Sequence, residues 1–188
     1  MDAQSWITLI AVIVALFGGI FWEWWKKPKI RFSISNHEPH IIIKYPEFIK
    51  YFRINVENKG RTTARNCCVK LISVKNLNSN RNLIEPDKLK WASAPKDTKY
   101  TNDEHFPIHR EYKDIHPEGG WEFCDIFKLE STKLVELKFM SSGNRTTEIR
   151  DEYLIIIEIS GDNFKPKRAT IRTHNPKNNY WDITWSWN

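Results

Sequence analysis

Apolar and polar side chains alternate through the stretch Tyr51-Phe52-Arg53-Ile54-Asn55-Val56-Glu57, and the sequence Asn58-Lys59-Gly60 follows it directly. Successive side chains of a β-strand point to opposite faces, so this order places Phe52, Ile54 and Val56 together on one face. The pattern predicts an antiparallel strand with one face buried and the other in water. Asn, Lys and Gly after the last alternating residue predict a tight turn at its end.

Patterns of the same period continue on both sides of this strand. They predict further strands at 30–35, 41–44, 64–74, 89–91, 121–127, 134–140, 153–159, 168–173 and 181–187. Between 77 and 118, Pro and polar residues predict long connections around one short strand, and their role stays open. Many short strands separated by Gly, Pro and Asn predict an all-β fold, an antiparallel β-sandwich formed by residues 29–188.

The first 28 residues differ from the rest of the chain. Residues 3–22 carry no charged side chain, and a helix of that length spans about 30 Å, the thickness of the hydrocarbon core of a bilayer. Aromatic and basic residues typical of membrane interfaces lie at its two ends: Trp6, Trp22, Trp24, Trp25, Lys26 and Lys27. The segment predicts a single N-terminal transmembrane helix. A buried helix and a cleaved signal peptide are the alternatives.

Charge and cysteine content predict the compartment. Basic residues follow the predicted helix and none precedes it, which places residues 29–188 on the cytoplasmic side of the cell membrane. Cys67, Cys68 and Cys124 are an odd set with two adjacent members, so they are not a disulfide framework. Free thiols fit a reducing compartment.

Small side chains recur at every fourth position of the predicted helix, at Ala11, Ala15 and Gly19. Such a face allows close approach of a second helix, which predicts a homo-oligomer or a helical membrane partner. Chance placement is the alternative, because Ala and Gly are common in membrane helices.

One segment carries a family resemblance. The stretch from Val56 to Leu71, with Asn58-Lys59-Gly60 and Ala64-Arg65-Asn66, resembles the strand, turn and strand signature of immunoglobulin-like modules of the CARDB type. The stretch Ile115-His116-Pro117-Glu118-Gly119-Gly120-Trp121 is similar to a turn of those modules, with the Gly displaced by one residue. The resemblance implies an immunoglobulin-like sandwich used as a spacer, adhesion or interaction domain. Such modules are usually exported, so an exported adhesion-type module is an alternative function.

Motifs for catalysis, cofactors or metals are absent from the sequence. It contains no Gly-x-Ser-x-Gly, Walker-type loop, dinucleotide fingerprint or His-Glu-x-x-His. The pairs His37 with His40 and His105 with His109 lack companion ligands at metal-binding spacing. We therefore predict a protein that is not an enzyme and that holds no cofactor or metal. For the cysteines, we favour a role as small buried hydrophobic residues over the alternative of a redox or metal site.

The formal charge is +6, and because the first 25 residues contribute only Asp2 and Glu23, the remainder carries +8. Basic and aromatic residues of the predicted strands and turns are candidates for a ligand or partner surface: Arg61, Arg65, Lys165, Lys167, Arg168, Arg172, Trp185 and Trp187. Charged edges that prevent strand pairing are the alternative. The leading hypothesis is a membrane-anchored interaction domain that contacts the lipid bilayer and recruits a protein partner at the cytoplasmic surface. The alternative is a membrane-tethered sensor of a nucleotide or nucleic acid.

Overall fold

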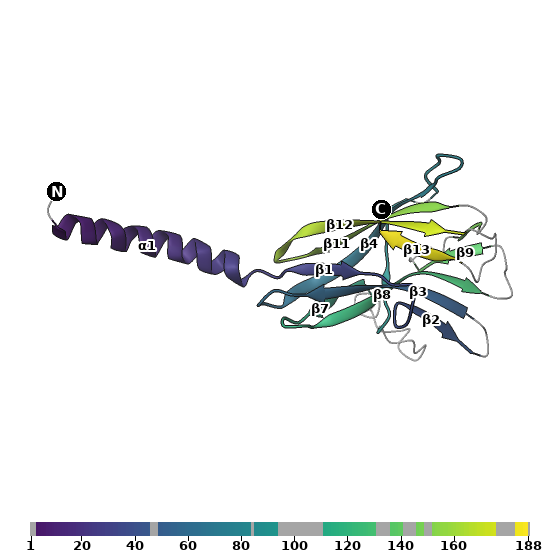
Figure 1. Cartoon of the computed structure of the whole chain (residues 1–188), viewed down its shortest axis with the longest axis horizontal. Helices are drawn as coiled ribbons and strands as arrows, with labels where there is room; N and C mark the ends of the chain where they lie inside the picture. Colours follow the sequence, from purple (N-terminus) through teal and green to yellow (C-terminus); the bar gives the residue numbers. More distant parts are fainter. Residues whose placement is uncertain are drawn as a thin grey trace, which may run out of the picture.

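In a computed structural model the described part of the chain begins with helix α1 and continues into two β-sheets that face each other (Figure 1). The structure describes residues 3–45, 49–83, 85–93, 111–130, 136–140, 146–148, 152–175 and 183–187. The elements are α1 (Ala3–Lys26), β1 (Ile30–Ser33), β2 (Ile41–Lys44), β3 (Ile49–Asn58), β4 (Ala64–Asn76), β5 (Asp87–Lys88), β6 (Lys90–Trp91), β7 (Lys113–Ile115), β8 (Trp121–Glu130), β9 (Glu136–Phe139), β10 (Thr146–Glu148), β11 (Tyr153–Gly161), β12 (Phe164–His174) and β13 (Thr184–Trp187).

The two sheets are antiparallel throughout the described pairings. The first has the order β1-β3-β8-β9-β10, with β2 also paired to β3 and β6 to β8. The second has the order β13-β12-β11-β4-β5, with β7 also paired to β4. Because Ile30 pairs with Asn58, β1 starts beside the end of β3. The connection from β3 to β4 therefore carries the chain between the sheets at the end where α1 joins.

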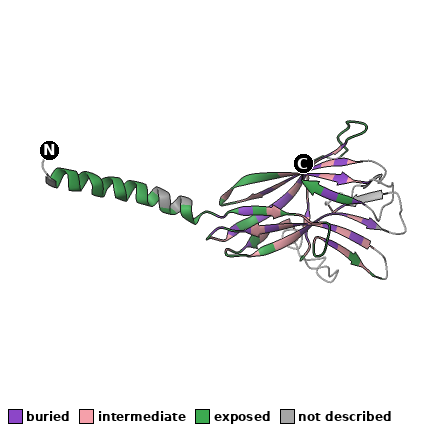
Figure 2. Ribbon diagram, in the orientation of Figure 1, coloured by how far each residue is buried: buried purple, intermediate pink, exposed green. Residues whose placement is uncertain are grey.

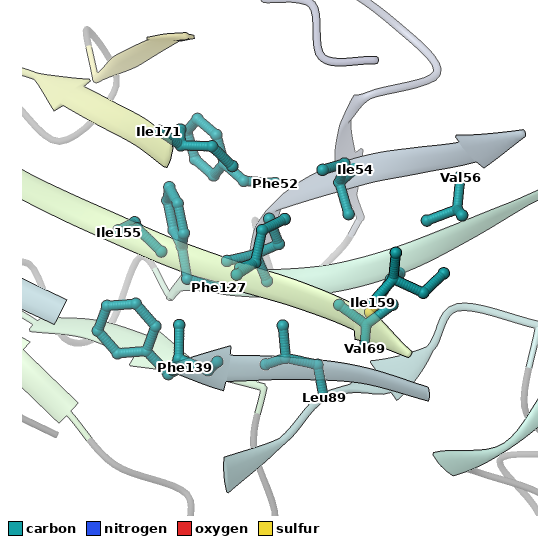
Figure 3. Close-up of a cluster of buried hydrophobic side chains, with 14 of the residues drawn as sticks. Phe52, Ile54, Val56, Val69, Leu89, Phe127, Phe139, Ile155, Ile159 and Ile171 are labelled. Carbon is teal, nitrogen blue, oxygen red and sulfur yellow. The ribbon is translucent and has the colours of Figure 1, made fainter. Parts of the chain in front are cut away.

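The core lies between the sheets and follows the predicted alternation. Phe52, Ile54 and Val56 of β3 have no exposed surface, and Ile155 and Ile159 of β11 face them from the other sheet (Figure 3). Burial of one such side chain contributes about 1.5–3 kcal/mol. The hydrophobic contact of two amphipathic sheets is therefore what holds the layers together, and the prediction of an all-β fold is confirmed.

The helix α1 extends away from one end of the sandwich, and its described side chains are exposed (Figures 1 and 2). Within the part of the chain that the structure describes, no helix is both long enough and apolar enough to cross a membrane. The prediction of a transmembrane helix in residues 1–28 is therefore wrong.

The residues predicted to mark this helix are placed as follows. Trp6, Trp22 and Trp25 are exposed, as are Lys26 and Lys27, while the side chain of Trp24 lies outside the described residues. Ala11, Ala15 and Gly19 are also exposed, and a Cβ added to Gly19 would meet no atom within 4 Å. Association through this small-residue face stays a prediction.

Candidate functional site at the base of the helix

A buried asparagine fastens the base of α1 to the sandwich. Asn58, at the end of β3, is fully buried, and its Oδ1 accepts hydrogen bonds from the backbone N of Lys29 at 3.1 Å and of Gly60 at 2.9 Å. Its Nδ2 donates to the carbonyl oxygens of Thr62 at 2.8 Å and Ile115 at 3.0 Å. An amide has two donors and two acceptor lone pairs, so this side chain is fully satisfied. It joins the segment after α1, the turn after β3, and β7.

The turn after β3 packs directly against the backbone that follows α1. A Cβ added to Gly60 would lie 2.5 Å from the N of Lys29 and 2.6 Å from the O of Lys27, which leaves no room for a side chain. Thr62 Oγ1 donates to the carbonyl oxygen of Lys26 at 2.5 Å, which satisfies one of the carbonyls that a helix leaves free at its C-terminus. These contacts fix where the helix leaves the sandwich.

Basic residues from three parts of the sequence gather around this joint. We call this surface the basic end; it comprises Lys26, Lys27, Arg61, Arg65, Lys165 and Lys167. The hairpin from β11 to β12 joins the turn after β3, because Asn163 Oδ1 accepts from the N of Arg65 at 3.1 Å and Asn163 Nδ2 donates to the O of Thr63 at 2.8 Å. Lys167 Nζ donates to the O of Ile30 at 2.7 Å.

The basic end keeps most of its charge. Among the described residues, no salt bridge neutralises Arg61, Arg65 or Lys165, and all three are exposed. The guanidinium of Arg61 instead lies 4.5 Å from the ring centroid of Trp25, close enough for a cation–π contact. Two nearby carboxylates, Asp114 and Asp162, accept hydrogen bonds from the backbone and side chain of Asn66. The basic end is therefore positively charged, and the two nearby carboxylates are bound to Asn66.

Of the basic residues proposed from the sequence, Arg168 and Arg172 are held differently. Arg168 Nε lies 2.8 Å from Glu158 Oε2, and Arg172 Nη2 lies 2.5 Å from Glu152 Oε2. Arg172 is also five residues beyond Lys167 in β12, a separation of about 17 Å along a strand. The two ion pairs leave less positive charge on Arg168 and Arg172 for a ligand. Because of its distance from Lys167, Arg172 is not part of the basic end.

The two candidate tryptophans of β13 have different environments. Trp185 is 2% exposed and its ring packs edge-on against Phe52 at 5.5 Å and Phe127 at 5.9 Å. Its Nε1 donates to the carbonyl oxygen of Ser35 at 2.9 Å. Trp187 is 43% exposed. Trp185 therefore belongs to the core and offers no surface to a partner, whereas Trp187 does.

The cysteines lie in environments that suppress thiol chemistry. All three are buried and free. Burial, followed by the charge of Asp114, raises the pKa of Cys67 to about 12, and burial also raises the pKa of Cys68 and of Cys124. Since the thiolate is the reactive form, the thiols stay protonated and inert at neutral pH. In the described part of the chain no three His, Cys, Asp or Glu side chains are placed to hold a metal, and His105 and His109 fall outside it.

The joint itself was not identified from the sequence. Asn58 was recognised only as part of a turn, because local sequence does not show that its amide reaches Ile115, which is 57 positions away. The sequence assigns Lys26 and Lys27 to the flank of the helix. Their assembly with Lys165 and Lys167 depends on the pairing of β1 with β3 and on the hairpin of β11 with β12.

Comparisons with known proteins give little information about this chain. No family model matches it, and no curated protein matches it. One solved structure that matches is a β-glucosidase from Erythrobacter marinus, at 12% sequence identity over 77% of this chain and with a TM-score of 0.31. This chain spans 15% of the length of that enzyme. The resemblance to CARDB-type modules and the cytoplasmic placement of residues 29–188 stay predictions.

Proposed function

We propose that this protein is a non-enzymatic interaction domain that recruits an acidic protein partner through its basic end. One observation carries the proposal: two segments far apart in the sequence place exposed Arg61, Arg65 and Lys165 at the same end of the sandwich, and no described carboxylate forms a salt bridge with them. Like charges repel each other, so such a cluster costs stability unless something opposes it. A partner with acidic side chains removes that cost and gains orientation from complementary charge.

The rigid joint supports this function. Asn58 and Gly60 fix the backbone beneath the basic end through short contacts on three segments. A surface that is already ordered before binding loses less conformational entropy when a partner docks. The basic end is therefore displayed in a constant arrangement without further folding.

The test measures binding of a fluorescent oligo-glutamate peptide to the full chain by anisotropy, at a series of salt concentrations. The double variant Arg61→Glu with Lys165→Glu should weaken binding by about tenfold or more, since opposite charges become like charges. The matched control, Lys70→Glu with Lys75→Glu, changes the net charge equally on β4, away from the basic end, and should bind far better than the first variant. Equal weakening by both pairs would show that only net charge matters and would reject the proposal.

A nucleotide or nucleic acid is the second candidate ligand, and one observation favours it. Trp25 is 39% exposed beside Arg61, and aromatic rings next to basic groups provide the stacking that single-stranded nucleic acid uses. Single-stranded oligo-thymidine with the same charge as the oligo-glutamate peptide separates the two candidates. Trp25→Ala should leave oligo-glutamate binding nearly unchanged. If oligo-thymidine binds more tightly and loses affinity in Trp25→Ala, the second candidate replaces the first.

A further inference from the structure

The strand β2 lies at an edge of the first sheet, and among the described residues it pairs only with β3 (Figure 1). The N of Arg53 donates to the carbonyl oxygen of His40 at 2.8 Å, so the backbone of His40 faces β3. Backbone groups alternate in direction along an antiparallel strand. Those of Ile42 therefore also face β3, whereas those of Ile41 and Ile43 point away from it. The edge presents the N–H and C=O of Ile43 to whatever lies beside it.

The neighbouring edge, at β13, is already occupied by side chains of the chain itself. Asn36 Nδ2 donates to the O of Trp185 at 3.2 Å, and the N of Trp185 donates to Asn36 Oδ1 at 3.0 Å. Lys50 Nζ donates to the carbonyl oxygen of Ile183 at 3.3 Å. Covering the backbone of an edge in this way prevents another strand from joining it. In the described part of the chain, no side chain bonds the backbone of Ile43.

A pocket of about 410 Å³ opens beside the edge of β2. Ile41 and Ile43 of β2 and Ile183, just before β13, contribute apolar side chains to its lining. Side chains alternate along a strand, so Ile41 and Ile43 share one face. Ile41 is 8% exposed, but Ile43 is 37% exposed. The pocket therefore leaves an isoleucine uncovered next to the outward-pointing backbone groups.

We propose that the edge of β2 binds an extended segment of a partner protein, which joins the first sheet as an added strand. One residue of this segment pairs with Ile43, donating to its C=O and accepting from its N–H. Residues that lie opposite each other in a sheet point to the same face. This residue therefore points into the pocket, as do the positions two before and two after it, and the intervening residues lie beside Ile42 and Lys44. The site selects alternating apolar and polar side chains.

The size of β2 favours a short segment over a second folded copy of the chain. The strand has four residues, a span of about 14 Å. Specific interfaces between folded proteins bury about 1,200–2,000 Å² in total, whereas an unfolded segment needs only the edge and the pocket. A small molecule would fill the pocket without pairing with the N–H and C=O of Ile43. An extended backbone with apolar side chains satisfies both parts of the site.

The experiment titrates the full chain by calorimetry with the uncharged peptide acetyl-Thr-Leu-Thr-Leu-Thr-amide. Binding should slow amide hydrogen exchange at Ile43, because its N–H becomes bonded. The control peptide acetyl-Thr-Leu-Leu-Thr-Thr-amide has the same composition without the alternation and should bind at least about tenfold more weakly.

Three substitutions at one position separate the backbone from the side chain. Ile43→Pro removes the outward N–H at an edge position, where proline is tolerated, and should weaken the alternating peptide by about tenfold. Ile43→Lys keeps the N–H but places a charge beside the pocket, and should weaken it by a similar factor. Ile43→Val keeps both features and is the matched control, which should bind almost as the wild type does. Circular dichroism verifies that each variant is folded.

Three outcomes would overturn the proposal. The first is absence of binding by the alternating peptide, or equal affinity for the two peptides. The second is wild-type affinity in folded Ile43→Pro and Ile43→Lys. The third is exchange at Ile43 that slows with protein concentration in the absence of peptide, which would assign the edge to a second copy. None of these outcomes bears on oligo-glutamate binding, because the basic end and the edge of β2 share no residues.

Discussion

Two asparagines fasten opposite ends of the sandwich, and they do so at different depths. Asn58 is fully buried and uses all four hydrogen-bonding positions of its amide on three separate segments. Asn36 is exposed and, among the described residues, its side chain bonds the backbone of Trp185. The difference indicates where the stability of each end resides. At the helix end, stability depends on the amide of Asn58. At the other end, near β13, it depends on the indole ring of Trp185, whose backbone Asn36 helps to hold.

Replacement of Trp185 by Ala should give the largest effect. The ring packs edge-on against the stacked rings of Phe52 and Phe127, so its removal leaves a cavity in the core. Truncation of a buried aromatic side chain typically lowers the free energy of unfolding by about 3–5 kcal/mol. Urea denaturation measures this loss. Trp187→Ala, on the same strand but exposed, should cost less than about 1 kcal/mol. A similar cost for both would mean that the end of the sandwich near β13 does not depend on the buried ring.

Asn58→Ala should give the next largest effect. It removes four hydrogen bonds and leaves the carbonyl oxygens of Thr62 and Ile115 without this donor, so the free energy of unfolding should fall by about 2–4 kcal/mol. Amide hydrogen exchange at Lys29 and Gly60 should accelerate as the joint opens. Asn163→Ala is the control: it also removes two bonds to the backbone, but at an exposed position, and should cost about 1 kcal/mol or less. If Asn58→Ala costs no more than Asn163→Ala, burial of the amide is not what makes the joint firm.

Asn36→Ala tests the weaker of the two asparagine contacts. It should lower the free energy of unfolding by only about 1 kcal/mol, because water can replace the lost partner at an exposed site. The local structure around Trp185 should respond more than the global stability. Hydrogen exchange at Trp185 should rise, because its backbone N donates to Asn36 Oδ1. Global destabilisation as large as that of Asn58→Ala would contradict the difference between the two ends.

The strands could be predicted from the sequence because each encodes its own burial pattern. Phe52, Ile54 and Val56 alternate with polar residues, and the same three side chains are buried in the structure. The short strands β7 and β10 were missed, since three residues are too few to show a period. The prediction of a transmembrane helix was wrong because a run of apolar residues in the sequence does not by itself establish a membrane-spanning helix.

The sites could be predicted only in part, because they form where distant segments meet. The sequence provided Arg61, Arg65, Lys165 and Lys167 as basic residues, but not their separation from Arg172, which pairs with Glu152. The burial of Lys50 had no sequence signal. Lys50 stands among the alternating residues of β3, and its burial beside Ile183 follows from the arrival of β13, 133 positions later. Local sequence patterns therefore predict the strands, whereas the sites form only when distant strands pair in the folded chain.

The smallest predicted effect is the pH dependence of stability that comes from Cys67, near the helix end. This contribution is absent at neutral pH. Burial raises the pKa of this thiol from 9.0 to about 12, whereas in the unfolded chain it ionises near its ordinary value. Below about pH 9 both states hold the proton, so stability does not depend on this group; between about 9 and 12 only the unfolded state releases it, and stability falls as the pH rises. Cys67→Ala should therefore lower the overall stability but flatten its decline above pH 9, measured by urea unfolding at a series of pH values. Because Cys68 and Cys124 have raised pKa values as well, part of the decline should remain. Parallel profiles for wild type and variant above pH 9 would show that Cys67 is not protected from ionisation and that the helix end admits water at β4.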